Sequence, residues 1–262
     1  MVPLRPATLG EGVGAWFSGR DVAAAPVPLG GAGNLAHRRP HRPADLAAAR
    51  RAVGAATDTD PRRWHLLHQV HGAEVAVVDD RTPPGAELRG VDAAVTACAE
   101  RPLVVQTADC VPVLLAAPGA VGVAHAGRAG VTVGVVAAAV AALRELAGAT
   151  APVRAVLGPA IGPCCYEVPA DLRDAVVARL AAVGPAGIAE APQVASRTSW
   201  STPSLDLPTA VRAQLRAAGV EVTGSAAPCT HCDPDWFSHR RDPASGRQIG
   251  LVVRRADAGA GS

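Results

Sequence analysis

Residues 107–127 read "TADCVPVLLAAPGAVGVAHAG", two apolar runs separated by a Pro-Gly step. The runs cover residues 111–116 and 120–125. Short apolar runs rich in Val and bounded by turn residues are typical of buried β-strands. Cys110 stands at the start of the first run and His125 at the end of the second. Because two strands joined by a turn can lie side by side, this stretch predicts a thiol and an imidazole as neighbours.

Strands and helices alternate outward from this stretch. Further strands are expected at residues 74–79, 91–97, 102–106, 153–158 and 248–253. Helices are expected at residues 45–54, 130–146, 169–183 and 207–219. Asp45 is the expected N-cap of the first helix and Gly54 its stop, while Gly148 closes the second. Asp206 is the expected N-cap of the last helix, with Pro208 in its first turn. The order of elements indicates an α/β fold.

The length of 262 residues suits one domain, 1–262, with its core at about 12–254. Apolar residues make up 49% of the chain but aromatic residues only 3%, so the core is expected to consist of small side chains, mostly Ala and Val. Residues 18–44 and 255–262 are rich in Pro, Gly or Arg, which favours a loop-rich segment and a flexible tail.

The charged residues exclude several classes of protein. The sequence contains no Lys, so P-loop and Schiff-base chemistry are excluded, and anions must be bound by Arg and backbone N–H groups. The net charge is only +2 and the Arg residues are dispersed, which argues against nucleic-acid binding. The longest apolar run, residues 131–142, is too short to span a membrane. The start of the chain lacks a signal-peptide core, so a cytoplasmic enzyme is expected.

The six cysteines are scattered unevenly, which favours reduced thiols or metal ligands over a disulfide framework. Cys229 and Cys232 form a C-x-x-C pair, typical of a redox pair or half of a structural zinc site. No second pair has this spacing, so these two are expected to pack as ordinary thiols.

The segment "LLHQVHGAEV", residues 66–75, adds two histidines, His68 and His71. His71 could join Cys110 and His125 as a third ligand, and three protein ligands leave a position open for water or substrate, as in catalytic zinc sites. A second reading makes Cys110 a nucleophile with His125 as its base and no metal. A third reading makes the histidines ordinary loop groups.

Several motifs together carry a resemblance to a known family. They are "QVHG", "TADCVPVLL", "VAHAG", "LGPAIGPCCYEV", "LDLPTAVRAQLRAAGV" and "CTHCDPDWFSHRRDPASGRQIGLV". In this order, over residues 64–253, the chain resembles the bacterial YfiH family, also called laccase-domain or polyphenol oxidase proteins. The resemblance implies an αββα-like domain of mixed sheets between helices. It also implies a zinc-dependent purine nucleoside phosphorylase acting on adenosine, inosine and S-methyl-5′-thioadenosine, with phosphate as co-substrate and possible adenosine deaminase activity.

The resemblance assigns His71, Cys110 and His125 as the metal ligands, while His68 matches no ligand and is expected to be structural. Zinc is the expected metal, with copper as the second candidate. Multicopper oxidases use paired H-x-H motifs, and the sequence contains none, so the name polyphenol oxidase is not expected to describe the activity.

Four further residues are candidates for catalysis or substrate binding. Arg20, in "WFSGR", takes the place of the family's early "TR" element and is a candidate phosphate ligand with a catalytic role. Arg240 and Arg241, in "SHRRD", are further candidates for substrate binding. Asp109, next to Cys110, is the candidate catalytic carboxylate that orients a ligand or moves a proton. The alternative is that it caps a turn.

One motif departs from the family. Where the family reads "HAGWRG", this chain reads "HAGRAG", so Arg128 takes the Trp position and Ala129 the Arg position. Arg128 is retained as a substrate-binding candidate. The loss of a guanidinium at Ala129 leaves open whether activity and substrate choice are kept.

Three other functions fit parts of the sequence. "CAE" at 98–100 and "PCTHC" at 228–232 look like the two halves of a zinc deaminase site, but more than a hundred residues separate them. A Cys-His hydrolase acting on peptidoglycan precursors would use Cys110 and His125. A degenerate, metal-bound partner protein without catalysis is the third.

Overall fold

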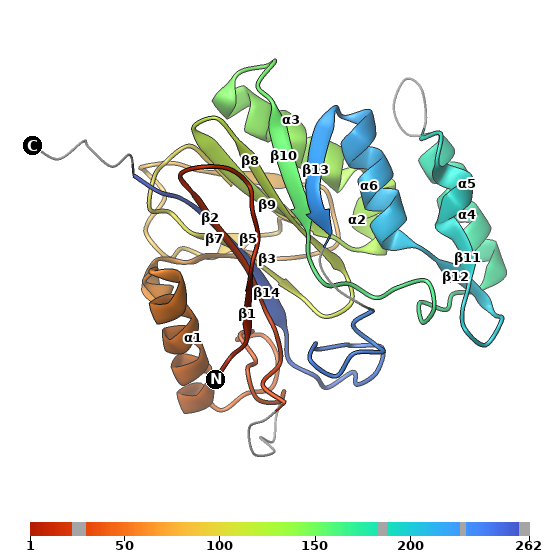
Figure 1. The fold of residues 1–262 in the computed structure, drawn as a ribbon, viewed down its shortest axis with the longest axis horizontal. Coiled ribbons are helices and arrows are strands. Elements are labelled where there is room, and N and C mark those ends of the chain that lie inside the picture. Colours follow the sequence, from red (N-terminus) through yellow and green to blue (C-terminus); the bar gives the residue numbers. More distant parts are fainter. Residues whose placement is uncertain (23–29, 183–187, 226–228, 257–262) are drawn as a thin grey trace, which may run out of the picture.

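The computed structural model describes residues 1–22, 30–182, 188–225 and 229–256. Two six-stranded mixed sheets pack against each other, and helices cover their outer faces (Figure 1). The expected αββα-like α/β domain is therefore confirmed. The loop-rich segment and the tail fall partly outside the described residues, at 23–29 and 257–262. Among the helices described, none is long and apolar enough to cross a bilayer.

The first sheet has the order β1 (Leu4–Pro6), β2 (Val13–Ser18), β14 (Gln248–Arg254), β7 (Leu103–Thr107), β3 (His65–His68) and β5 (Leu88–Arg89). The second has the order β13 (Val220–Ser225), β10 (Val153–Leu157), β8 (Val111–Ala117), β9 (Ala120–Ala126), β6 (Ala93–Thr96) and β4 (Val75–Val78). A small ribbon of β11 (Ala195–Arg197) and β12 (Pro203–Leu205) lies apart from both.

The helices are α1 (Pro43–Thr57), α2 (Arg128–Val133), α3 (Val135–Ala147), α4 (Ala170–Ala181), α5 (Ala191–Val194) and α6 (Leu207–Ala217). A 3₁₀ turn, η1 (Pro61–Arg63), follows α1. Helices α3 and α6 pack on the second sheet, and α1 packs against the first. In Figure 1, α4 and α5 lie at one side of the molecule, beside β11 and β12.

Strand β8 shows why the two apolar runs form the centre of the fold. Side chains alternate along a strand, so Val113 and Leu115 point toward the helices, while Leu114 and Ala116 point into the layer between the sheets. All four are buried. A strand that is buried on both faces has a continuous run of apolar residues, without polar residues at every second position. The sequence of β8 has this continuous apolar pattern.

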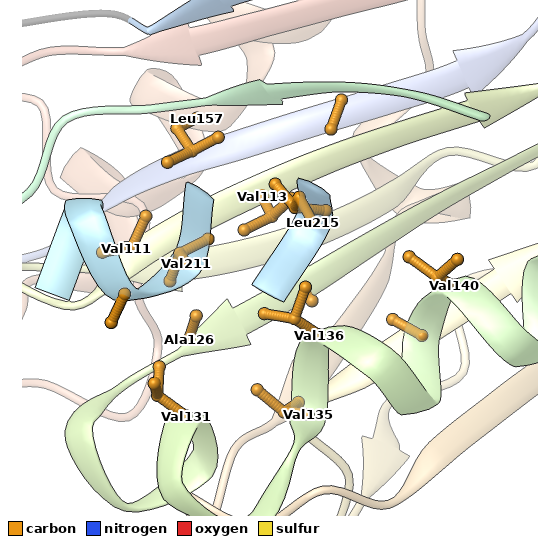
Figure 2. Close-up of a cluster of buried hydrophobic side chains, with 14 of the residues drawn as sticks. Val111, Val113, Ala126, Val131, Val135, Val136, Val140, Leu157, Val211 and Leu215 are labelled. Atoms are coloured by element: carbon orange, nitrogen blue, oxygen red, sulfur yellow. The ribbon is translucent and has the colours of Figure 1, made fainter. Parts of the chain in front are cut away.

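The helix-facing core consists mostly of Val, Ala and Leu, as the composition predicts. Figure 2 shows Val135 and Val136 of α3, Val211 and Leu215 of α6 and Val113 of β8 as parts of one cluster. Because Val and Ala side chains are short, the helices can pack close to the second sheet. This packing fixes β8 and β9, whose ends carry Cys110 and His125.

Two helices differ from the expectation, the one expected at 130–146 and the one expected at 45–54. The helix expected at 130–146 is two helices, α2 and α3, because Gly134 adopts φ +88°, a left-handed conformation that ends one helix and begins the next. Gly148 closes α3 as expected.

The last helix begins as expected, since the Asp206 side chain accepts a hydrogen bond from the Thr209 backbone N–H at 2.9 Å.

The first helix is longer at both ends than the expected range of 45–54. Helix α1 begins after Arg42, so Asp45 lies in its first turn instead of capping it. Gly54 does not stop the helix, which continues to Thr57. A Cβ at Gly54 would lie 2.6 Å from the Thr59 carbonyl oxygen, so glycine is needed there for close approach of the following turn.

Candidate metal centre

The three expected ligands meet at one end of the two central strands. Cys110 directly precedes β8, and His125 lies in β9 opposite Pro112. His71 comes from the turn after β3. The expected juxtaposition of Cys110 and His125 therefore follows from the antiparallel register of β8 and β9.

The spacing of the ligand atoms fits a tetrahedral metal ion. The Cys110 Sγ lies 3.8 Å from the His71 Nε2, and the three ligand atoms all lie within 4.8 Å of one another. Zinc binds sulfur at about 2.3 Å and imidazole nitrogen at about 2.0 Å, which places two such ligands about 3.6 Å apart in a tetrahedron. The donor set of two imidazoles and one thiolate is one that zinc prefers, and it leaves a coordination position open.

Asp92 organises both histidines and was missed by the sequence analysis. Its Oδ1 lies 2.7 Å from the His125 Nδ1, which leaves Nε2 of that ring for the ligand role. The same carboxylate accepts the backbone N–H groups of Val70, His71 and Gly72 at 2.7–3.1 Å. These bonds hold the turn in which His71 adopts φ +62°. The only signal in the sequence is an acidic residue at the start of a buried apolar strand, "VDAAV".

Gly127 of "VAHAG" allows the ligands to approach the backbone. A Cβ at this position would lie 2.7 Å from the His71 Cδ2 and 3.0 Å from the Cys110 Sγ. Any larger residue would therefore push His71 and Cys110 apart.

The electrostatics of the ligand group favour a thiolate. Burial raises the pKa of Cys110, but His125 and His71 outweigh it and lower that pKa to about 6. Burial lowers the pKa of His125, while the Cys110 sulfur and Asp92 together raise it to about 9. At neutral pH the metal-free pair is thus a thiolate beside an imidazolium, and the thiolate is the form of cysteine that binds metals or acts as a nucleophile.

The ligands open into a cavity of about 380 Å³. Its walls carry Arg38, Arg39 and Arg247, together with His68 and His239, but no Asp or Glu. A concave site of this size suits a small-molecule ligand, and its charge suits an anion. His68, which was expected to be structural, lies on the cavity wall and is not part of the group formed by His71, Cys110 and His125.

Two of these arginines are held by backbone carbonyls. Arg247 donates to the carbonyl oxygens of Ser245 and Gly246 at 3.0 and 2.9 Å, and Arg39 donates to those of Pro243 and Ser245. Neither guanidinium pairs with a carboxylate within the described ranges. Burial lowers the pKa of Arg247, and Arg39 nearby lowers it further. Cys110 and Asp109 act in the opposite direction and raise that pKa, so the two like charges are held close together with these anionic groups nearby.

Arg38 differs from these two. It donates two hydrogen bonds to Glu87, at 2.9 and 2.7 Å, and its charge is already balanced. None of Arg38, Arg39 and Arg247 was singled out from the sequence. Arg38 and Arg39 lie outside the quoted family motifs, and Arg247 lies within one to which no role at that position was assigned.

The expected phosphate ligand Arg20 lies elsewhere. It lines a separate hollow with Phe237 and Arg241, and its backbone N–H donates to the Asp235 carbonyl at 2.6 Å. It is absent from the lining of the cavity that holds His71. The structure therefore does not bring Arg20 together with the metal ligands, and its catalytic role stays a prediction.

Asp109 adopts φ +95° and its carboxylate is fully engaged. It accepts the Thr230 hydroxyl and the Arg240 backbone N–H, both at 2.7 Å. These contacts join the residue before Cys110 to the loop after β13. They are the contacts of a positioning residue, and the expected proton transfer by Asp109 stays a prediction.

Arg240 and Arg128 gather around Tyr166, which is near Cys110. The Arg240 guanidinium donates to the Glu167 carbonyl at 2.9 Å and lies 5.2 Å from the centre of the Tyr166 ring. Burial raises the pKa of Tyr166, and Arg128 opposes that shift. Arg128 and Arg240 thus remain predicted candidates for substrate binding, but neither is among the residues that line the cavity with Arg39 and Arg247.

The residues of the deaminase-like pattern do not come together. Cys98 contacts Asp80, and Glu100 pairs with Arg255 at 3.1 Å. Over the part of the chain that the structure describes, the groups able to hold a metal contain neither Cys98 nor Glu100.

Known proteins resemble this chain over most of its length. The profile of the family described as multi-copper polyphenol oxidoreductase laccase matches residues 15–255. A Streptomyces coelicolor protein named purine nucleoside phosphorylase is 45% identical over 216 residues, 80% of this chain and 83% of that protein. A Mycobacterium tuberculosis protein of the same name is 40% identical over 212 residues, 80% of each chain.

Solved structures show the same fold. The crystal structure of YlmD from Geobacillus stearothermophilus has a TM-score of 0.79 at 31% identity, covering 94% of this chain and 93% of that one. The Bacillus licheniformis protein YfiH has a TM-score of 0.80 at 27% identity and covers 93% of both chains.

Proposed function

Because the chain belongs to the multi-copper polyphenol oxidoreductase laccase family, which includes the YfiH proteins, and has relatives named purine nucleoside phosphorylase, we propose that it is a zinc-dependent purine nucleoside phosphorylase. Adenosine, inosine and S-methyl-5′-thioadenosine are the proposed substrates. The main support is one cavity that combines three metal ligands with two arginines that lack carboxylate partners.

Phosphorolysis requires an anion beside a nucleoside. An oxygen of phosphate forms a bond to C1′ of the ribose, while the bond from C1′ to the purine nitrogen breaks and its electron pair leaves with the base, which then takes up a proton. Arg39 and Arg247 would bind and orient the phosphate, because guanidinium groups match its geometry. Their anchored side chains would lose little freedom on binding.

The metal would be held by His71, Cys110 and His125, with Asp92 fixing the orientation of His125. A bound zinc ion supplies a Lewis acid at the cavity wall. Zinc is proposed ahead of copper, because three protein ligands with a position left open for water or substrate are typical of a catalytic zinc site, and the sequence contains none of the H-x-H motifs of multicopper oxidases. Adenosine deamination is proposed as a side activity of the same cavity.

One observation favours a second candidate, a Cys-His hydrolase. Cys110, His125 and Asp92 form a thiol, imidazole and carboxylate series in which the pKa of the thiol is lowered. This series would also activate a nucleophile without a metal. The position of His71 at 3.8 Å from the same sulfur favours the metal site.

The decisive experiment measures base release from the three nucleosides by purified protein, with and without phosphate, together with metal content. We expect release that requires phosphate and yields ribose 1-phosphate, or its 5-methylthio derivative from S-methyl-5′-thioadenosine. Loss of one charged hydrogen-bond donor in Arg39→Ala should raise the KM for phosphate about tenfold or more. Arg62→Ala, which removes an exposed arginine outside the cavity lining, is the matched control and should leave it unchanged.

Two results would contradict the proposal. Zinc-loaded protein that releases no base in phosphate would exclude the phosphorylase. Metal-free protein with a hydrolytic activity that is lost on alkylation of Cys110 would establish the hydrolase instead.

A further inference from the structure

Four cysteines gather at a second place, away from the cavity lining. Cys164 and Cys165 follow β10, and Cys229 and Cys232 follow β13. Strands β10 and β13 are parallel neighbours, so the loops that leave their carboxyl ends emerge at the same edge of the sheet. The sequence contains no second C-x-x-C pair, and the partner pair is the adjacent Cys164 and Cys165.

The four sulfur atoms converge on one point. The Cys232 Sγ lies 3.9 Å from the Cys164 Sγ and 3.3 Å from the Cys165 Sγ, and all four sulfurs lie within 4.8 Å of one another. Four sulfurs about 2.3 Å from a tetrahedral zinc ion lie about 3.8 Å apart. The observed spacing therefore surrounds a volume suited to one ion.

The backbone around these sulfurs is shaped to them. The Cys229 carbonyl accepts the N–H groups of Cys232 and Asp233, both at 3.0 Å, which folds the C-x-x-C segment into a tight turn. The Gly162 N–H donates to the Cys229 Sγ at 3.1 Å. A Cβ at Gly162 would lie 3.3 Å from the Cys164 Sγ, so the glycine allows the loops to close around the group. Backbone N–H groups directed at sulfur stabilise a thiolate.

Ordinary packing does not explain the group, because Cys232 is exposed and Cys164 and Cys229 are only partly buried. We propose that Cys164, Cys165, Cys229 and Cys232 bind one zinc ion in a closed, structural site. Four thiolates select a soft or borderline metal over magnesium or calcium, and four protein ligands leave no position for substrate. Binding releases protons from the thiols.

This ion would fasten two loops that support the cavity. The first loop continues into Tyr166 and Glu167, and the second carries Thr230, which donates to Asp109 beside the ligand Cys110. Arg240 of the second loop donates to the Glu167 carbonyl of the first. The proposed zinc site is therefore a positioning device for the residues around Tyr166.

The test is metal content of the full chain, purified with reductant and without oxygen. We expect about two zinc ions per chain, one in each site. Cys229→Ser combined with Cys232→Ser should lower this to about one and leave the ion at His71, Cys110 and His125. Cys98→Ser removes a cysteine outside the group and should keep about two. If the double variant retains about two zinc ions, the proposal is overturned.

A second measurement covers the case in which the serine variants do not fold. Cobalt is titrated into the metal-free Cys110→Ala chain, in which the four cysteines remain intact. Saturation at one equivalent with an intense thiolate-to-cobalt absorption band and tetrahedral cobalt bands supports the site. Cobalt binding without the thiolate band, or a disulfide between Cys165 and Cys232 in the anaerobically purified protein, overturns it.

Discussion

The two candidate metal centres both rely on thiolate ligands but differ in the number of protein ligands. His71, Cys110 and His125 supply three and open into a cavity, whereas the four cysteines supply four and enclose their central point. A tetrahedral ion with three protein ligands keeps one coordination position free for water or substrate, whereas an ion with four protein ligands has none free and serves a structural role. With both proposed ions bound, one chain would keep a metal that takes part in chemistry separate from a metal that holds two loops together. It also makes the two centres separable by experiment.

The largest expected effect is loss of the reactive centre. Cys110→Ala and His125→Ala should each remove one metal ion per chain and lower phosphorolysis by about a thousandfold, because a Lewis acid contributes several kcal/mol. Elemental analysis and base-release rates measure both quantities. His68→Ala is the control, since it changes the cavity wall without removing a ligand, and equal metal loss in this variant would contradict the ligand assignment.

A smaller effect is expected at the carboxylate that supports the ligands. Asp92→Asn keeps the size of the side chain but weakens its bonds to His125 and to the turn that carries His71. Metal affinity or activity should fall about 10- to 100-fold. Competition with a zinc-binding dye measures the affinity, and the metal at the four cysteines should be unchanged. Normal affinity at the first centre would show that the ligands need no such support.

The smallest expected difference is in the order of metal loss. Exposure to a chelator should empty the open centre first, because a competing ligand can enter its free position, while the enclosed cysteine site releases metal later. Timed sampling should therefore show activity falling before the zinc content drops below about one per chain. Simultaneous loss of both ions would contradict the distinction between an open and a closed centre.

Local sequence patterns predicted the elements that local rules determine. The apolar runs of β8 and β9 and the Asp206 cap followed from their own residues. The carboxyl end of α1 was misplaced, because contacts from Thr59 and Pro61 decide the role of Gly54. The three candidate ligands His71, Cys110 and His125 were named because the family motifs contain them, and the structure brings them together. Such motifs cannot be read from composition or spacing alone.

The rest of the site depends on contacts between distant segments. Asp92 reaches His71 and His125 across 21 and 33 positions, and the cysteine pairs are joined by loops separated by more than 60 residues. Arg39 and Arg247 meet only because the segment near residue 40 packs against the loop before β14. The residue pattern within one segment does not indicate which distant segments pack against it.

Strand β14 is near the end of the chain yet lies in the interior of the first sheet, between β2 and β7. During synthesis, β2 and β7 leave the ribosome long before the strand that joins them. Until residues 248–254 emerge, both have an unpaired edge that can associate with other chains. A protein truncated before β14 would therefore be an aggregation hazard and a target for degradation, so the cell would retain only completed copies.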